Sequence, residues 1–189
     1  YTRITFMSNA QPPLPRLFHH RWSVPVLAEL GRGDGSRFVN LSRRLGIGRE
    51  SLRRTLEWLV EQGLVVRNPG YGHPLRPEYV LTARGAELAP ACIQLTFALH
   101  ALQAEDVGLN KWSMPVVAAL DDLGDGRFSQ LRDRLPPISP RALTLALKAL
   151  SDAGLVERRV VDGFPPSTLY RLSRRARPIR PPLRRMAIA

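Results

Sequence analysis

The chain carries the same stretch of sequence twice, and this duplication limits its fold more than any other feature. RWSVPVLAEL in the first copy returns as KWSMPVVAAL in the second, and the register then holds to the end of the repeat at an offset of 90 or 91 residues. Repeats of this kind indicate two copies of one folding unit. The matched pairs are 21–30 with 111–120, 37–45 with 127–135, 47–67 with 138–158, and 79–85 with 170–176.

The third helix of the unit has the clearest pattern. In the first copy Leu52, Leu56 and Leu59 recur at helical spacing, which indicates one buried face. Gly48 is placed to open this helix and Gly63 to end it. The second copy keeps the pattern, with Ser139 at the opening and Gly154 at the end. We therefore predict the same helix twice.

The remaining elements of each copy follow in a fixed order. Val24, Leu27 and Leu30 predict a first helix, and residues 37–45 a second. The motifs GDGSRF and GDGRF predict turns between these two helices. Two short β-branched runs around a Pro/Gly-rich tip predict a hairpin after the third helix. Three helices followed by a hairpin make a winged helix-turn-helix.

The expected fold class is therefore α+β and mainly helical. It consists of two tandem winged helix-turn-helix domains joined by a central helix over residues 86–104, in a pseudo-twofold arrangement. Three prolines predict that the basic C-terminal segment RRARPIRPPLRRMAIA forms no stable helix. The expected parts are an extended or disordered arm at 1–13, domain 1 at 14–85, a linker helix at 86–105, domain 2 at 106–176, and a basic Pro-rich tail at 177–189.

Charge points to a polyanionic partner. The net charge is +12, with +7 in residues 1–85, −3 in 86–110, +2 in 111–173 and +6 in 174–189. Basic blocks around a neutral-to-acidic connector suggest flanks that face phosphate, so double-stranded DNA is the expected partner. The sequence shows neither a membrane-length apolar run nor a signal-peptide pattern. A lone Cys92 fits a reducing cytosol, so we expect a cytoplasmic protein.

The order of motifs in each copy resembles that of a known family. It has (K/R)W at a helix start, then RF-x-x-L, then I-(S/G)-x-x-x-L-x-x-x-L-x-x-L-x-x-x-G-L-V, then Y-x-L-(T/S), all twice. This order is similar to that of the HxlR-type transcriptional regulators. The resemblance implies a DNA-binding fold that normally acts as a homodimer. Many relatives also have a sensing cysteine before the first helix, whereas Phe18 and Gly108 lie in those regions here, which argues against thiol sensing.

The candidate DNA contacts lie on the outward faces of the recognition helices and in the wings. Arginine suits guanine edges and phosphates, and the matching positions of the second copy carry less charge. The alternative interpretation of the first-copy charges is a set of ion pairs on a solvated helix face, but the repeat context favours DNA contact. The candidates are Arg49, Glu50, Arg53, Arg54, Arg67, His73, Arg76, Arg141, Thr144, Lys148, Arg158 and Arg159.

The apolar linker also leaves room for a small apolar or aromatic effector, because cavities favour domain interfaces. Trp58, which has no tryptophan counterpart in the second copy, is expected either to pack on the linker helix or to line such a pocket. The basic tail is expected either to track DNA or to be disordered. The candidate pocket residues are Trp58, Cys92, Leu95, Leu99 and Trp112.

The sequence favours a non-enzymatic transcriptional regulator, a monomer that acts as a pseudo-dimer on two half-sites. No catalytic residues, cofactor motif or metal-ligand spacing are present, so we expect no enzyme, no cofactor and no metal. Two other functions stay open. One is a DNA-protecting or drug-sequestering resistance or repair protein, and the other is a tandem winged-helix module that binds proteins.

Overall fold

The computed structural model describes residues 14–33, 35–68, 77–162 and 167–188. Within these residues each sequence repeat folds into a helical core with a three-stranded antiparallel sheet. The first unit contains α1 Leu14–Leu17, α2 Ser23–Leu30, β1 Ser36–Arg37, α3 Phe38–Leu45, α4 Arg49–Glu61, β2 Val65–Asn68, β3 Glu78–Leu81 and α5 Ala83–Ala101. The second contains α6 Glu105–Gly108, α7 Ser113–Leu123, β4 Asp125–Arg127, α8 Phe128–Arg134, α9 Pro140–Asp152, β5 Val156–Val161, β6 Ser167–Leu172, the 3₁₀ helix η1 Arg174–Ile179 and α10 Arg180–Ile188.

The predicted winged helix-turn-helix is confirmed in both copies. The strand orders are β1-β3-β2 and β4-β6-β5, so the two sheets repeat one topology. One correction concerns the GDGSRF and GDGRF motifs, which we expected to be turns alone. They also supply β1 and β4, which pair with the return strands β3 and β6. Strands of two or three residues are too short to show an alternating pattern.

The same polar contact closes each recognition helix onto its sheet. Gly63 and Gly154 end the turns after α4 and α9 with left-handed φ values of 66° and 68°. The carbonyl of Gly63 accepts a hydrogen bond from the Thr82 hydroxyl at 2.7 Å, and the carbonyl of Gly154 accepts one from the Ser173 hydroxyl at 2.6 Å. These contacts fix each wing relative to its recognition helix.

The central helix α5 lies three residues earlier than the 86–104 that we expected. It begins after Thr82, whose side chain accepts a hydrogen bond from the Gly85 amide at 3.1 Å and so caps the helix. It ends at Ala101 because Gln103 adopts a φ of +50°. Consequently the central helix belongs to the first unit alone, and a separate helix, α6, opens the second unit.

The expectation that the C-terminal segment cannot form a helix is also wrong. Pro181 and Pro182 occupy the first turn of α10, where a missing amide hydrogen removes no helical hydrogen bond. Ile179, Leu183 and Met186 then form a helical stripe that is at most 2% exposed. This stripe packs α10 against α5 and α7.

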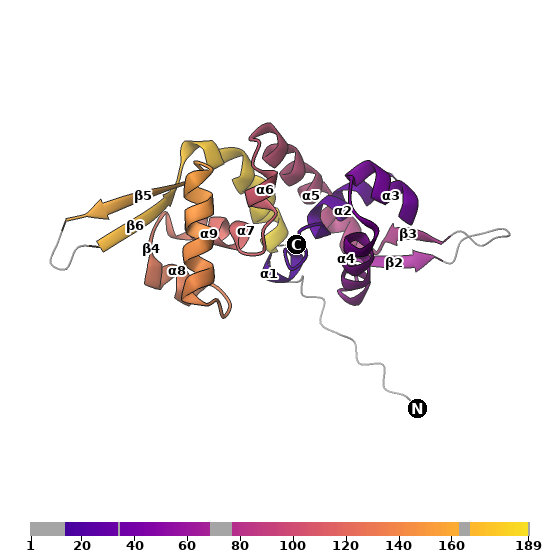
Figure 1. The fold of residues 1–189 in the computed structure, drawn as a ribbon, viewed down its shortest axis with the longest axis horizontal. Coiled ribbons are helices and arrows are strands. Elements are labelled where there is room, and N and C mark those ends of the chain that lie inside the picture. The colour runs from indigo at the N-terminus through magenta and orange to yellow at the C-terminus, as the bar shows by residue number, and fades with distance from the viewer. Residues whose placement is uncertain (1–13, 34, 69–76, 163–166, 189) are drawn as a thin grey trace, which may run out of the picture.

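The pairing of α5 with α10 forms the centre of the molecule. The two wings extend from it in opposite directions (Figure 1), and Leu14 and Pro15 of α1 line one groove together with Met186 and Ala187 of α10. The short helix α1 of the first unit packs on α7 of the second. Asp121 of α7 links this helix to α10, because its nearly buried carboxylate accepts hydrogen bonds from Arg180 and Arg184. The helices that follow the two wings, α5 and α10, thus pack against each other within one polypeptide.

Candidate nucleic-acid interface

The recognition helix α4 presents a charged face because its leucines are used by the core. Leu52, Leu56 and Leu59 are at most 1% exposed, so they hold the opposite side of the helix against the domain. Gly48 precedes the helix in an extended conformation and lets it start at Arg49. The α4 candidates Arg49, Glu50, Arg53 and Arg54 are all exposed, and so is Glu57.

Ion pairs connect these exposed side chains. Arg53 bridges two carboxylates, with its guanidinium nitrogens 2.7 Å from Glu50 and 2.6 Å from Glu57. Arg54 Nε lies 2.8 Å from the same Glu50 oxygen. Hydrogen bonds from Arg53 and Arg54 lower the pKa of Glu50 to about 2, and the two carboxylates raise the pKa of Arg53. The ion-pair interpretation therefore describes this face in the free protein.

The positive surplus of the first unit does not lie on its recognition helix. The α4 sequence RESLRRTLEWLVE contains three arginines and three glutamates, so its formal charges cancel. Exposed pairs of this kind contribute little stability because water screens them. Arg53 and Arg54 can therefore exchange Glu50 for another anionic or acceptor group at small cost. Arg49 lies instead over the ring of Phe38, 5.9 Å from its centroid.

The second recognition helix, α9, is arranged in the same way with fewer charges. Ser139 caps it, and its side chain accepts a hydrogen bond from the Ala142 amide at 3.2 Å. The candidates Arg141, Thr144 and Lys148 are exposed, as predicted from the leucine spacing. Lys148 Nζ pairs with Asp152 at 2.6 Å, and the Thr144 hydroxyl donates to the backbone carbonyl of Pro140 at 2.9 Å.

The strands of the wings carry further exposed cations. Arg67 on β2 and Arg158 and Arg159 on β5 are exposed. One guanidinium nitrogen of Arg158 lies 3.5 Å from the Thr168 hydroxyl across the hairpin. The two remaining wing candidates, His73 and Arg76, lie outside the described residues.

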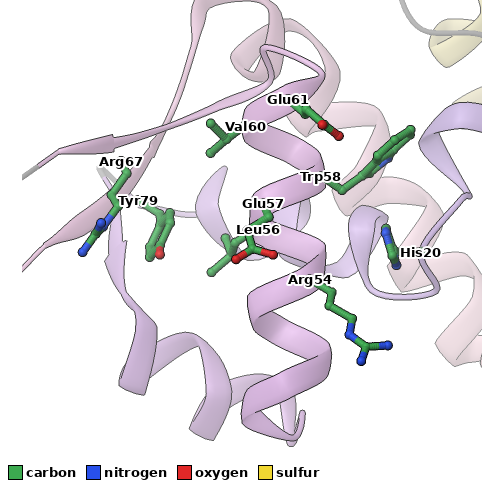
Figure 2. Close-up of a pocket in the computed structure, with 9 residues that line it drawn as sticks. All are labelled: His20, Arg54, Leu56, Glu57, Trp58, Val60, Glu61, Arg67 and Tyr79. Atoms are coloured by element: carbon green, nitrogen blue, oxygen red, sulfur yellow. The ribbon is translucent and has the colours of Figure 1, made fainter.

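A groove of about 580 Å³ runs across α4 toward the first wing. In Figure 2, Arg67 and Tyr79 of the wing lie on one side of α4, and His20 and Trp58 lie on the other. Arg54 also lines it. Three predicted site residues, Arg54, Trp58 and Arg67, thus border one concave surface. We did not predict His20 or Tyr79, because each reaches the groove from a distant part of the sequence.

The contacts of Trp58 include a segment that we did not predict, residues 16–20. Its indole nitrogen donates a hydrogen bond to the carbonyl of Arg16 at 3.1 Å. Its ring stacks on His19 with a centroid distance of 4.6 Å and also meets His20 at 5.9 Å. Partial burial lowers the pKa of His20, and the nearby charges of His19 and Arg54 lower it further. The partner of Trp58 is thus the segment that precedes α2.

The five predicted pocket residues are not brought together. Cys92, Leu95 and Leu99 of α5 are fully buried in the core. Trp58 borders the groove of Figure 2, whereas Trp112 lines a separate groove in the second unit. Burial raises the pKa of the Cys92 thiol to about 12, which disfavours its reactive thiolate.

Within residues 14–33, 35–68, 77–162 and 167–188, no cluster of three or more His, Cys, Asp or Glu side chains is arranged to hold a metal ion. In the same residues, even the 19-residue α5 does not combine the length and hydropathy that a membrane span requires.

Comparison with known proteins finds the same repeat. A profile of the HxlR-like helix-turn-helix family matches twice, over residues 17–104 and 107–188. An uncharacterised HTH-type transcriptional regulator of Synechocystis is 42% identical over 74 residues, which make up 39% of this chain and 54% of that protein. One from Mycobacterium bovis is 42% identical over 79 residues, or 42% of this chain and 49% of that protein. The chain thus spans about half the length of the curated relatives it matches. The crystal structure of diamide-treated YodB from B. subtilis is similar with a TM-score of 0.40 and 25% identity, covering 47% of this chain and 84% of that one.

Proposed function

Because this chain belongs to the HxlR-like helix-turn-helix family, we propose that it is a DNA-binding transcriptional regulator with both recognition helices on one polypeptide. The observation that carries the proposal is that α4 and α9 are both exposed, each beside its own wing. The recognition helix of a helix-turn-helix enters the major groove, and its side chains contact base edges. One chain therefore presents two recognition helices to one DNA molecule.

The arrangement of the units supports binding to two successive half-sites. At about 1.5 Å per residue, the 19 residues of α5 span roughly 28 Å. Half-sites one helical turn apart are separated by about 34 Å. A central helix of this length, with the wings pointing outward, suits a single chain that binds two adjacent major grooves (Figure 1).

The two half-sites are expected to differ in base composition. Arg53 and Arg54 would leave Glu50 to contact guanine or phosphate, and Glu50 would accept a hydrogen bond from cytosine. At the position of Arg54 the second unit has Leu145, which is 57% exposed and suited to a thymine methyl group. We therefore expect a non-palindromic site, with a G·C-rich half bound by α4 and a thymine-containing half bound by α9.

Selection of DNA from a random pool, followed by footprinting and fluorescence anisotropy, tests this proposal. A bound site should contain two dissimilar half-sites, and the affinity should fall steeply with salt. Arg53→Ala should cost about 1–3 kcal/mol on the selected site if it contacts a guanine. Arg32→Ala removes the same charge at an exposed ion pair with Glu29 on α2, and it should have a smaller effect.

Two outcomes would favour the other functions. Equal affinity for selected and random DNA would instead support a DNA-protecting protein. Salt-insensitive binding to a protein, with no useful DNA affinity, would support a protein-interaction module.

A further inference from the structure

The two repeats differ in the groove between the recognition helix and the start of the first long helix of the unit. These helices are α4 and α2 in the first unit, and α9 and α7 in the second. In the first unit Trp58 occupies this place, with its ring against His19 and its nitrogen bonded to the Arg16 carbonyl. The repeat register aligns Trp58 with Ala149 and Arg54 with Leu145. Two large side chains are thus replaced by smaller, apolar ones. The second unit has an open groove of about 460 Å³ there.

The groove combines an aromatic wall, apolar sides and one cation. Trp112, together with Leu145 and Ala149 of α9, is among the residues that line it. Lys111 Nζ lies 5.5 Å from the centroid of the Trp112 ring. Of the described residues that line the groove, none is acidic, and Asn110 and Ser113 add polar groups. Such a groove complements a flat apolar body that carries a negative charge.

We propose that this groove binds a small planar aromatic acid, at the place that corresponds to the Trp58 indole of the first unit. Its volume lies within the roughly 300–1,000 Å³ typical of small-molecule sites. The ring of the ligand would stack on Trp112, as aromatic pairs prefer in offset arrangements. Its carboxylate would pair with Lys111 in a charge-assisted hydrogen bond. The corresponding groove of the first unit is lined by two carboxylates, Glu57 and Glu61, which disfavour an anion, so we expect one molecule per chain.

The ligand would also affect DNA binding, and this second part rests on the proposed function. Leu145 lines the groove and lies on the exposed face of α9, beside Thr144. A ligand that contacts Leu145 therefore competes with a base for the same side chain. By linkage, the ligand lowers DNA affinity by the same factor by which DNA lowers ligand affinity.

Isothermal titration calorimetry of the full chain with 2-naphthoate tests the site without DNA. We expect saturable binding at one molecule per chain. Ala149→Trp supplies the indole that the first unit already has, and it should weaken binding at least tenfold. Val39→Trp is the matched control, because it adds the same side chain at a position that is 67% exposed on α3, and it should leave binding unchanged.

A second variant tests the charge. Lys111→Met should weaken 2-naphthoate about tenfold and leave the neutral 2-naphthamide unchanged. Because Lys111 is exposed, this variant decides the question even if Ala149→Trp fails to fold, as circular dichroism would reveal. The proposal is overturned if wild type shows no saturable binding. It is also overturned if a folded Ala149→Trp protein binds like wild type, since binding would then be general attraction of an anion to a basic protein. Equal binding by Lys111→Met would overturn the aromatic acid as the ligand class.

Discussion

Leu183→Ala should destabilise the whole protein, because the C-terminal helix α10 completes the central core. The Leu183 side chain is only 2% exposed, and α10 packs on both α5 and α7. Truncating a buried leucine to alanine typically costs about 2–5 kcal/mol, which combines lost burial with the cavity left behind. With a urea m-value of about 2–3 kcal/mol/M, the midpoint of unfolding should fall by about 1–2 M.

Urea unfolding followed by far-UV circular dichroism and tryptophan fluorescence measures this shift. Phe97→Ala is the control, because Phe97 is on α5 but is 71% exposed. Substitutions at such surface positions usually change stability by less than about 0.5 kcal/mol. A loss that small for Leu183→Ala as well would refute the reasoning, since α10 would then not be docked in solution.

Sedimentation at micromolar concentration should give a mass near 21 kDa, because α10 packs on α5 within the same chain. A tight dimer through residues 86–104 would contradict this pairing. Glu50→Gln should raise affinity for random DNA and increase the salt dependence by about one unit, because it frees Arg53 and Arg54. Glu61→Gln removes the same charge from α4 and should raise the affinity for random DNA less. Equal effects of the two substitutions would argue against the ion-pair network. With a pKa near 12, the Cys92 thiol stays protonated at pH 8 and should react with Ellman's reagent only on unfolding, so rapid reaction of the native protein would count against its burial.

The sequence predicted those features that depend on local spacing. The leucine stripes, the glycine at each helix end and the duplicated register predicted the paired winged helices and the exposed faces of α4 and α9. Even the contacts of Arg53 with Glu50 and Glu57 are visible as i,i+3 and i,i+4 spacings.

Two errors came from features that depend on position and long-range contact. We treated the prolines of the C-terminal segment as helix breakers, although Pro181 and Pro182 lie in the first turn and the stripe of Ile179, Leu183 and Met186 was visible in the sequence. The partner of Trp58 is about 40 residues away in sequence, and no periodic pattern reports such a contact.

The joining of α5 and α10 within one polypeptide has a consequence for dosage. Below its dissociation constant, a regulator built from two separate chains loses active dimer with the square of chain concentration. Here the second half is always present at the high effective concentration that a short covalent connection provides. Halving the amount of protein therefore halves the amount of paired species and does not quarter it. A substitution also changes only one of the two units. The corresponding positions 58 and 149 could therefore acquire different residues, tryptophan in the first unit and alanine in the second.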